Sequence, residues 1–113
     1  MALEITKHNS EFSTVGQISP EEVSQIAALG YKSVIDNRPD MEGGHDQPLH
    51  VDIEKQVEAS GMQFAYLPVI SGAITPEQVQ QMASLIDSMP KPILAFCRSG
   101  ARSTNLYHLA LRT

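Results

Sequence analysis

Short segments rich in β-branched and aromatic residues alternate with segments of helical spacing along this chain. Strands are predicted over residues 12–18, 31–36, 64–70 and 92–96, and helices over residues 20–29, 51–60, 76–89 and 103–111. Parallel neighbours in a sheet need a connection about as long as a helix, so this alternation is typical of βαβ units. The sequence therefore predicts an α/β fold, in which a three-layer domain has a mostly parallel sheet with helices on both faces.

Two of the predicted helices begin with the same sequence signature. Ser19-Pro20-Glu21-Glu22 and Thr75-Pro76-Glu77-Gln78 each place a hydroxyl at the N-cap, proline at the first helical position and an acid or amide three residues after the cap. Gly30 and Gly61 follow the first and second helices, where a glycine is a common C-terminal stop. These boundaries divide the chain without leaving a linker, so residues 1–113 are expected to form one domain.

The composition limits the possible partners. Eight Lys and Arg against thirteen Asp and Glu give a net charge of -5, so no overall positive field attracts nucleic acid or an anionic membrane. The single cysteine, Cys97, excludes an internal disulfide, which suits a reducing compartment. The chain also has no apolar run of membrane-spanning length. We expect a cytoplasmic protein that binds a small anion through local geometry.

The most continuously apolar predicted strand, PILAF, is followed directly by the stretch CRSGARS. In a parallel sheet, such a run is expected at a buried central position, and ligands bind beyond the carboxyl ends of the strands. A glycine-containing loop that leads into a helix aims backbone N–H groups at one point, which favours an anion. The same donors stabilise a thiolate at Cys97, while Arg102 offers a planar fork to a tetrahedral oxyanion. We predict that Cys97 and Arg102 are catalytic.

The other residues of this loop have supporting roles in the prediction. The backbone of Ser99, Gly100 and Ala101 is expected to bind the anion, and Arg98 adds charge nearby although its side chain is expected to point outward. Ser103 has two readings: its hydroxyl assists the thiolate and the leaving group, or it caps the following helix. Cys97 as a purely structural buried cysteine is disfavoured, because packing alone does not explain two arginines beside it.

The stretch CRSGARS resembles the catalytic loops of two groups of enzymes. Cysteine-dependent protein phosphatases have five residues between Cys and Arg, with His usually before the Cys, whereas rhodanese-type sulfurtransferases often have four residues before a basic residue. Four residues separate Cys97 from Arg102, and Phe96 stands in the place of the histidine. The loop length is thus closer to the sulfurtransferase pattern.

Three longer blocks, VGQISPEEVSQIAALGYKSVIDNRPD, GMQFAYLPVISGAITPEQV and FCRSGARS, resemble the bacterial beta-lactamase-hydrolase-like, phosphatase-like domain family. The resemblance covers residues 12 to 112. It implies a protein-tyrosine-phosphatase-like fold and phosphatase-like activity, although relatives are also described as sulfur transferases.

The same resemblance raises the question of a general acid. In tyrosine and dual-specificity phosphatases, an Asp in the loop after the strand that precedes the Cys strand protonates the leaving oxygen. Here LPVISGAITP contains no carboxylate, and Ser71 lies about where the acid is expected. Asp40 in the stretch NRPD is the substitute that we predict, with a turn-forming role as its alternative. Arg38 in that stretch is either a second contact to the substrate anion or a solvated side chain.

These residues support three hypotheses. The first is a hydrolase whose Cys97 thiolate attacks a phosphate ester, and the second is a rhodanese-like sulfurtransferase that carries a persulfide on Cys97. The third is a binding module that keeps the loop for anion recognition. No cofactor is predicted, and no metal is predicted either, because His45, Asp46 and His50 lack the spacing of a zinc site.

Overall fold

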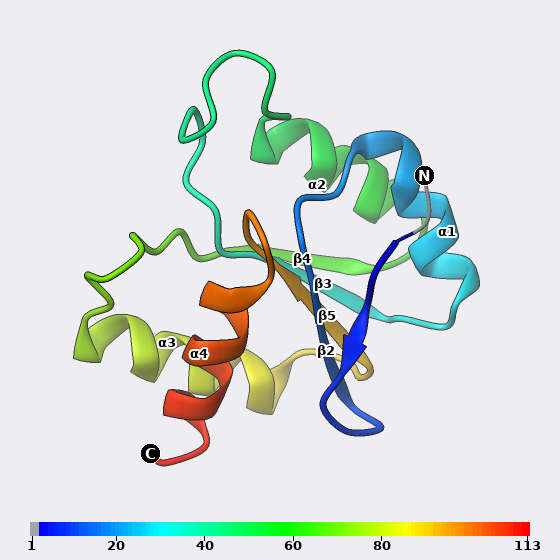
Figure 1. Cartoon of the computed structure of the whole chain (residues 1–113). Coiled ribbons are helices and arrows are strands. Elements are labelled where there is room, and N and C mark those ends of the chain that lie inside the picture. The colour runs from blue at the N-terminus through cyan, green and yellow to red at the C-terminus, as the bar shows by residue number, and fades with distance from the viewer. Residues whose placement is uncertain (1–2) are drawn as a thin grey trace.

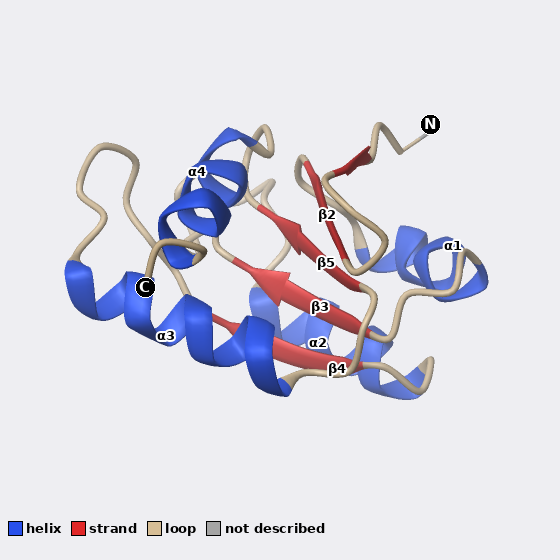
Figure 2. Cartoon of the chain, turned by 90° about the horizontal axis from the view of Figure 1, so that it is seen from below, coloured by secondary structure: helices blue, strands red, loops and turns tan. Residues whose placement is uncertain are grey.

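The computed structural model describes residues 3–113 and shows a five-stranded sheet between two pairs of helices (Figures 1 and 2). The strands are β1 (Thr6–Lys7), β2 (Phe12–Val15), β3 (Ser33–Asp36), β4 (Gln63–Tyr66) and β5 (Ile93–Phe96). The helices are η1 (Pro20–Glu22), α1 (Val23–Ala28), α2 (His50–Ala59), α3 (Pro76–Ser88) and α4 (Ala101–Ala110). The predicted three-layer α/β class is confirmed.

The strand order is β1-β2-β5-β3-β4, and among residues 3–113 only the β1–β2 pair is antiparallel. Strand β5 lies between β2 and β3 and pairs in parallel with both along its whole length. All four of its residues are buried. This confirms the prediction of a buried central strand, and it places Cys97 at the carboxyl edge of the sheet.

Alternate side chains of the sheet point into two separate cores. Val34 and Leu94 pack with the helices α1 and α2, whereas Ile35 and Ala95 pack with α3 and α4. Because both faces are covered, β5 carries apolar residues at every position in place of the alternation seen in half-exposed sheets. Figure 1 shows α1 and α2 on one side of the strands and α3 and α4 on the other.

The two helix starts predicted from capping signatures agree with the structure, whereas α4 begins at Ala101, two residues before its predicted start. Thr75 accepts a hydrogen bond from the Gln78 backbone N–H at 3.2 Å, and the Gln78 side chain accepts one from the Thr75 N–H at 2.9 Å. At Ser19 the Glu22 carboxylate accepts the backbone N–H at 2.9 Å, and a 3₁₀ turn leads into α1. These local contacts explain why short sequence signals were sufficient at both helix starts.

Two predicted strands are shorter than the sequence suggested. The predicted strand over 64–70 ends at Tyr66, and the one over 12–18 ends at Val15. Pro68 has no N–H for a ladder, and the following chain instead bonds to the exit of β3, with Val69 N–H donating to Asn37 C=O at 3.0 Å. Gly16 and Gln17 turn toward the Cys97 loop. The short strand β1 was not predicted.

No helix of the described residues is long and apolar enough to cross a membrane.

Leu94 in β5 offers a test of this central strand. Its side chain is fully buried, so Leu94→Ala is expected to lower the free energy of unfolding by about 2–5 kcal/mol, through lost burial and the cavity that remains. Urea denaturation followed by circular dichroism measures this change. Leu29, which is 64% exposed, is the matched control, and Leu29→Ala is expected to change stability by no more than about 0.5 kcal/mol. Equal effects of the two substitutions would contradict the assignment of β5 as the centre of the core.

Candidate active site

Cys97 lies directly after β5, and the loop that follows it turns back to begin helix α4. The Cys97 side chain is 1% exposed, and its sulfur accepts a hydrogen bond from the Gly100 backbone N–H at 3.1 Å. Gly100 is the N-cap of α4 and has φ of 92°, a left-handed conformation that suits glycine. The amide and the positive end of the α4 dipole both favour negative charge on the sulfur.

The loop is held against the end of β2 by close backbone contacts. Gln17 N–H donates to Arg98 C=O at 3.2 Å. A Cβ on Gly16 would lie 3.1 Å from the Arg98 carbonyl oxygen, and one on Gly100 would lie 3.3 Å from the Val15 backbone. The glycines therefore permit an approach that fixes the position of the loop before any ligand binds.

A cavity of about 670 Å³ opens above the Cys97 loop at the carboxyl edge of the sheet. It is lined by residues from three regions of the chain: the Cys97–Arg102 loop, the segment after β3 and the segment after β4. These are Arg38, Glu42, Gly43, Ser71, Cys97, Arg98, Ser99, Ala101 and Arg102. The loops after parallel strands thus form the cavity, as expected for sheets of this kind.

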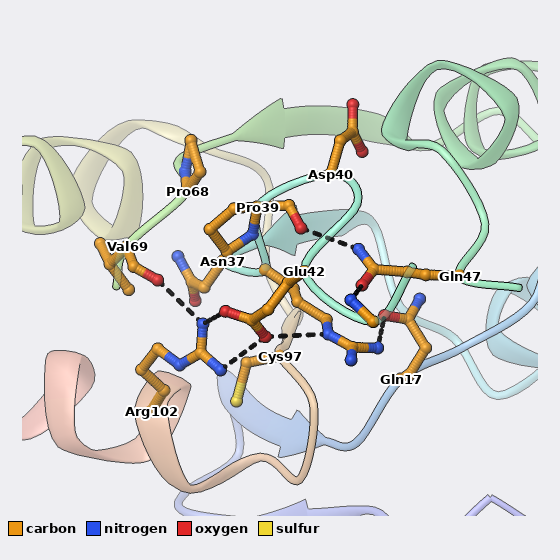
Figure 3. A network of polar contacts seen from close by, with 12 residues as sticks. Gln17, Asn37, Pro39, Asp40, Glu42, Gln47, Pro68, Val69, Cys97 and Arg102 are labelled. Atoms are coloured by element: carbon orange, nitrogen blue, oxygen red, sulfur yellow. Dashed lines mark hydrogen bonds and ion pairs between the residues drawn. The ribbon is translucent and has the colours of Figure 1, made fainter. Parts of the chain in front are cut away.

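Arg102 is fixed by three hydrogen bonds from its guanidinium group. Nη1 donates to Glu42 Oε2 at 2.9 Å and to the Val69 carbonyl at 2.8 Å, and Nη2 donates to Glu42 Oε1 at 2.9 Å. Arginine has five N–H donors. The two remaining donors, one on Nε and one on Nη2, share an edge of the guanidinium plane and form a fork for a bidentate anion. Figure 3 shows the Arg102 guanidinium beside the Cys97 sulfur.

Glu42 holds two arginines at once. Its Oε1 atom also accepts from Arg38 Nε at 3.0 Å, and Arg38 Nη1 donates to the Gln17 side-chain oxygen at 3.1 Å. The hydrogen bonds from Arg102 are the main cause that lowers the pKa of Glu42, and the bond from Arg38 adds to it. The pKa of Arg102 is raised mainly by its hydrogen bond to Glu42. Glu42 is therefore an ionised carboxylate in this arrangement and a poor proton donor.

Asp40 lies outside the cavity lining. Its Oδ1 accepts from the His50 backbone N–H at 2.8 Å, and its Oδ2 contacts His50 Nδ1 at 2.6 Å. The His50 ring in turn stacks on Tyr66 with 3.7 Å between ring centroids. Figure 3 shows the Asp40 carboxylate directed away from Cys97. The structure thus gives Asp40 a role in fixing the start of α2, and its role as a general acid stays a prediction that this geometry does not favour.

Ser103 lies next to the loop and does not cap α4, and its role in assisting the thiolate and the leaving group stays a prediction. Its buried hydroxyl donates to the Asn37 side-chain oxygen at 2.8 Å, and α4 already begins at Ala101. Asn37 then donates to the Leu67 carbonyl at 2.9 Å, so Ser103 ties α4 to the ends of β3 and β4. Ser71 lines the cavity close to where the sequence placed it.

The remaining predicted residues of the site lie in or beside the Cys97 loop and the segment after β3, and their contacts with a substrate stay predictions. Arg98 and Ser99 are exposed and Ala101 forms its wall, while Arg38 is buried and not solvated. Sequence reasoning missed Glu42, Asn37 and Gln17. Two of these had a signal: Glu42 is four residues after Arg38, a spacing that often pairs opposite charges, and Asn37 directly follows a strand that ends at the binding edge.

Asp36, at the end of β3, is a buried carboxyl group behind the cavity. Burial raises its pKa to about 7, although the Arg38 backbone N–H, 2.8 Å from Asp36 Oδ1, opposes this shift. Its side chain is on the α2 face of the sheet, near Asp40 and His50, both of which affect its titration. This carboxyl therefore takes up a proton within the neutral range.

Comparison with known proteins places this chain among phosphatase-like domains. A family model described as "Beta-lactamase hydrolase-like protein, phosphatase-like domain" matches residues 4–112. A curated beta-lactamase hydrolase-like protein of Xylella fastidiosa is 30% identical over 108 residues, which cover 96% of this chain and 25% of that protein. This chain thus spans about a quarter of the length of the curated relatives it matches.

Solved structures show the same fold. A "putative phosphatase" of Neisseria meningitidis has a TM-score of 0.82 and 33% identity, covering 89% of this chain and 71% of that one. A second "putative phosphatase", from Shewanella putrefaciens, has a TM-score of 0.81 and 22% identity, covering 94% and 68% of the two chains. The described chain therefore has a phosphatase-like fold.

Asp36 is expected to make stability fall as the pH rises. The raised pKa means that the folded state retains a proton that the unfolded state, in which the carboxyl has its ordinary pKa of 3.8, has already lost. Folding stability is therefore lost between pH 3.8 and about 7 as the pH increases. Asp36→Asn removes this titration, so the stability of the variant relative to the original chain should rise from pH 5 to pH 8. Urea unfolding at several pH values measures the difference, and a constant or falling difference would contradict the buried, protonated carboxyl.

Proposed function

Because the chain belongs to the family of the beta-lactamase hydrolase-like protein, phosphatase-like domain, we propose that it is a cysteine-dependent phosphatase acting on a small phosphate ester. The observation that carries this proposal is the Gly100 N–H directed at the Cys97 sulfur, 3.1 Å away, at the start of α4. This contact stabilises a thiolate at the base of the cavity that Arg102 lines.

Each step of the reaction has a candidate group. The Cys97 sulfur forms a bond to phosphorus while the bond from phosphorus to the leaving oxygen breaks, which gives a cysteinyl phosphate. The free edge of Arg102 and the loop amides bind the equatorial oxygens, where charge develops. Water then attacks phosphorus, releases phosphate and restores the thiolate. Since Glu42 is held ionised, substrates with leaving groups of low basicity are favoured.

A second candidate is the sulfurtransferase, and the four-residue spacing between Cys97 and Arg102 favours it. In this reaction the Cys97 thiolate attacks the outer sulfur of thiosulfate, the S–S bond breaks and sulfite leaves. The resulting persulfide passes its sulfur to a thiophilic acceptor. This chemistry needs no acid for the leaving group, which is compatible with the ionised Glu42.

A trapping experiment separates these functions. The protein is mixed with an aryl phosphate or with thiosulfate, quenched, and examined by intact mass and peptide mapping. A phosphoryl group on Cys97 together with steady release of the aryl alcohol is expected, and Cys97→Ser should abolish both. A stable persulfide on Cys97 without phosphate turnover would contradict the phosphatase in favour of the sulfurtransferase. If neither adduct forms but phosphate protects Cys97 from alkylation, the result would indicate a binding module.

Glu42 is expected to be a positioning residue for this reaction. Glu42→Gln removes the charge that holds Arg102 and Arg38, so kcat/KM for an aryl phosphate should fall by about tenfold or more. Glu42→Asp should restore part of the activity. The matched control is Glu58→Gln, on an exposed position of α2, which should leave kcat/KM unchanged.

The alternative role of Glu42 predicts the opposite sign. If its carboxylate competed with the substrate for Arg102, Glu42→Gln would bind inorganic phosphate more tightly and react faster. The inhibition constant of phosphate, measured beside kcat/KM, therefore distinguishes a carboxylate that orients Arg102 from one that blocks it.

A further inference from the structure

The cavity concentrates positive charge in a chain that is acidic as a whole. The sequence has four arginines and a net charge of -5, and three of those arginines, Arg38, Arg98 and Arg102, line this one cavity. Glu42 is the opposing carboxylate in the lining. One phosphate group uses Arg102 and the amides of the Cys97 loop, so the other two arginines remain to be explained.

Arg38 is the more informative of the two. Its side chain is only 10% exposed, and a buried guanidinium is unfavourable unless its donors find acceptors. Arg38 donates from Nε to Glu42 and from Nη1 to Gln17. Its Nη2 atom has no hydrogen-bond partner among the described residues, and because none of their unpartnered side-chain nitrogens is fully buried, Nη2 is accessible to solvent. A cationic side chain that is nine-tenths buried thus keeps free donors where it lines the cavity.

Gly43 is what lets Arg38 occupy this place. A Cβ on Gly43 would lie 2.6 Å from Arg38 Nη2, closer than real side chains come. Gly43 also lines the cavity. The absence of a side chain therefore leaves the Nη2 end of Arg38 free beside the cavity wall, where it is available to a ligand.

The two guanidinium groups are adjacent. Glu42 Oε1 accepts from Arg38 Nε at 3.0 Å and from Arg102 Nη2 at 2.9 Å, so both nitrogens lie within one hydrogen bond of the same oxygen. A single carboxylate balances only one of these two charges. The cavity volume of about 670 Å³ also exceeds what one phosphate group needs and is typical of sites for whole small molecules.

From this arrangement we infer that the substrate carries a second phosphate group next to the one that Cys97 attacks, and that Arg38 binds this second group. The inference rests on the proposed function, which it extends from a general phosphate ester to a small molecule with two neighbouring phosphates. Arg102 holds the reacting phosphate by its free edge, and Arg38 holds the neighbour by its free Nη2 donors. Arg98, on the exposed rim, adds long-range attraction.

Equilibrium binding tests the inference without any turnover. Calorimetry compares methylphosphonate with methylenediphosphonate, which are both resistant to hydrolysis and differ in the second phosphonate group. The original chain is expected to bind the diphosphonate about tenfold or more tightly than the monophosphonate. Arg38→Gln should reduce this preference to about threefold or less, with the larger loss in diphosphonate affinity.

Arg98→Gln is the matched control, because it removes the same charge from the exposed rim of the same cavity. It should retain most of the preference for the diphosphonate. No preference in the original chain, an unchanged preference in Arg38→Gln, or an equal loss in Arg98→Gln would overturn the inference. The last result would show that overall charge alone selects the ligand.

Arg38 also supports the loop through Glu42 and Gln17, so a second variant guards against general damage. Arg38→Lys keeps the charge but lacks the fork, and its preference should be intermediate. If Arg38→Gln binds neither compound, a full preference in Arg38→Lys overturns the inference and an intermediate one supports it. Because no step requires hydrolysis, an absence of phosphatase activity would contradict the proposed function and leave this binding result standing.

Discussion

The pairing of β5 on both sides is the constraint on which the site depends. β5 hydrogen-bonds in parallel with β2 and β3, and it is buried on both faces of the sheet. The residue after it must emerge at the carboxyl edge, between the exits of its two neighbours. The chain around Cys97 therefore meets both neighbouring strands: Gln17 after β2 bonds to Arg98 C=O, and Asn37 after β3 bonds to Phe96 C=O and to Ser103. Arg38, also after β3, lines the same cavity as Cys97. The fold assembles the site because the loops after neighbouring parallel strands meet at the carboxyl edge of the sheet.

The electrostatics of the site follow from this convergence. Glu42 reaches Arg102 across a separation of 60 residues in the sequence, and it links the segment after β3 to the start of α4. Its side chain is 28% exposed, so the contact is partly screened by water and is worth little as a source of stability. The contact orients Arg102, because it determines which edge of the guanidinium group remains free to bind an anion. An acidic chain thereby presents a locally cationic cavity.

The parts of the structure that could be predicted depend on neighbours in the sequence. The capping residues Thr75 and Gln78 lie three positions apart. The strand that precedes Cys97, the glycine of its loop and Arg102 also lie within a few residues of one another. Two ion pairs depend on how a glycine-containing loop folds over the sheet edge. They join Glu42 to Arg102 and Asp40 to His50. Local periodicity contains no information on that path, so the sequence suggested Asp40 as the acid where the structure brings Glu42 to the cavity.

The carboxyl groups near the cavity limit which substrates can react, because a leaving oxygen of high basicity needs a proton donor. Two arginines hold Glu42 ionised. Asp40 is paired with His50. Asp36 takes up a proton near neutral pH, but it is buried and does not line the cavity. A leaving oxygen of high basicity would find no ready donor among these carboxyl groups. A phosphate or an aryl oxide leaves without such help because it is weakly basic. The site is therefore suited to substrates whose leaving group stabilises its own charge, and a second phosphate beside the reacting one would meet Arg38 and satisfy that requirement.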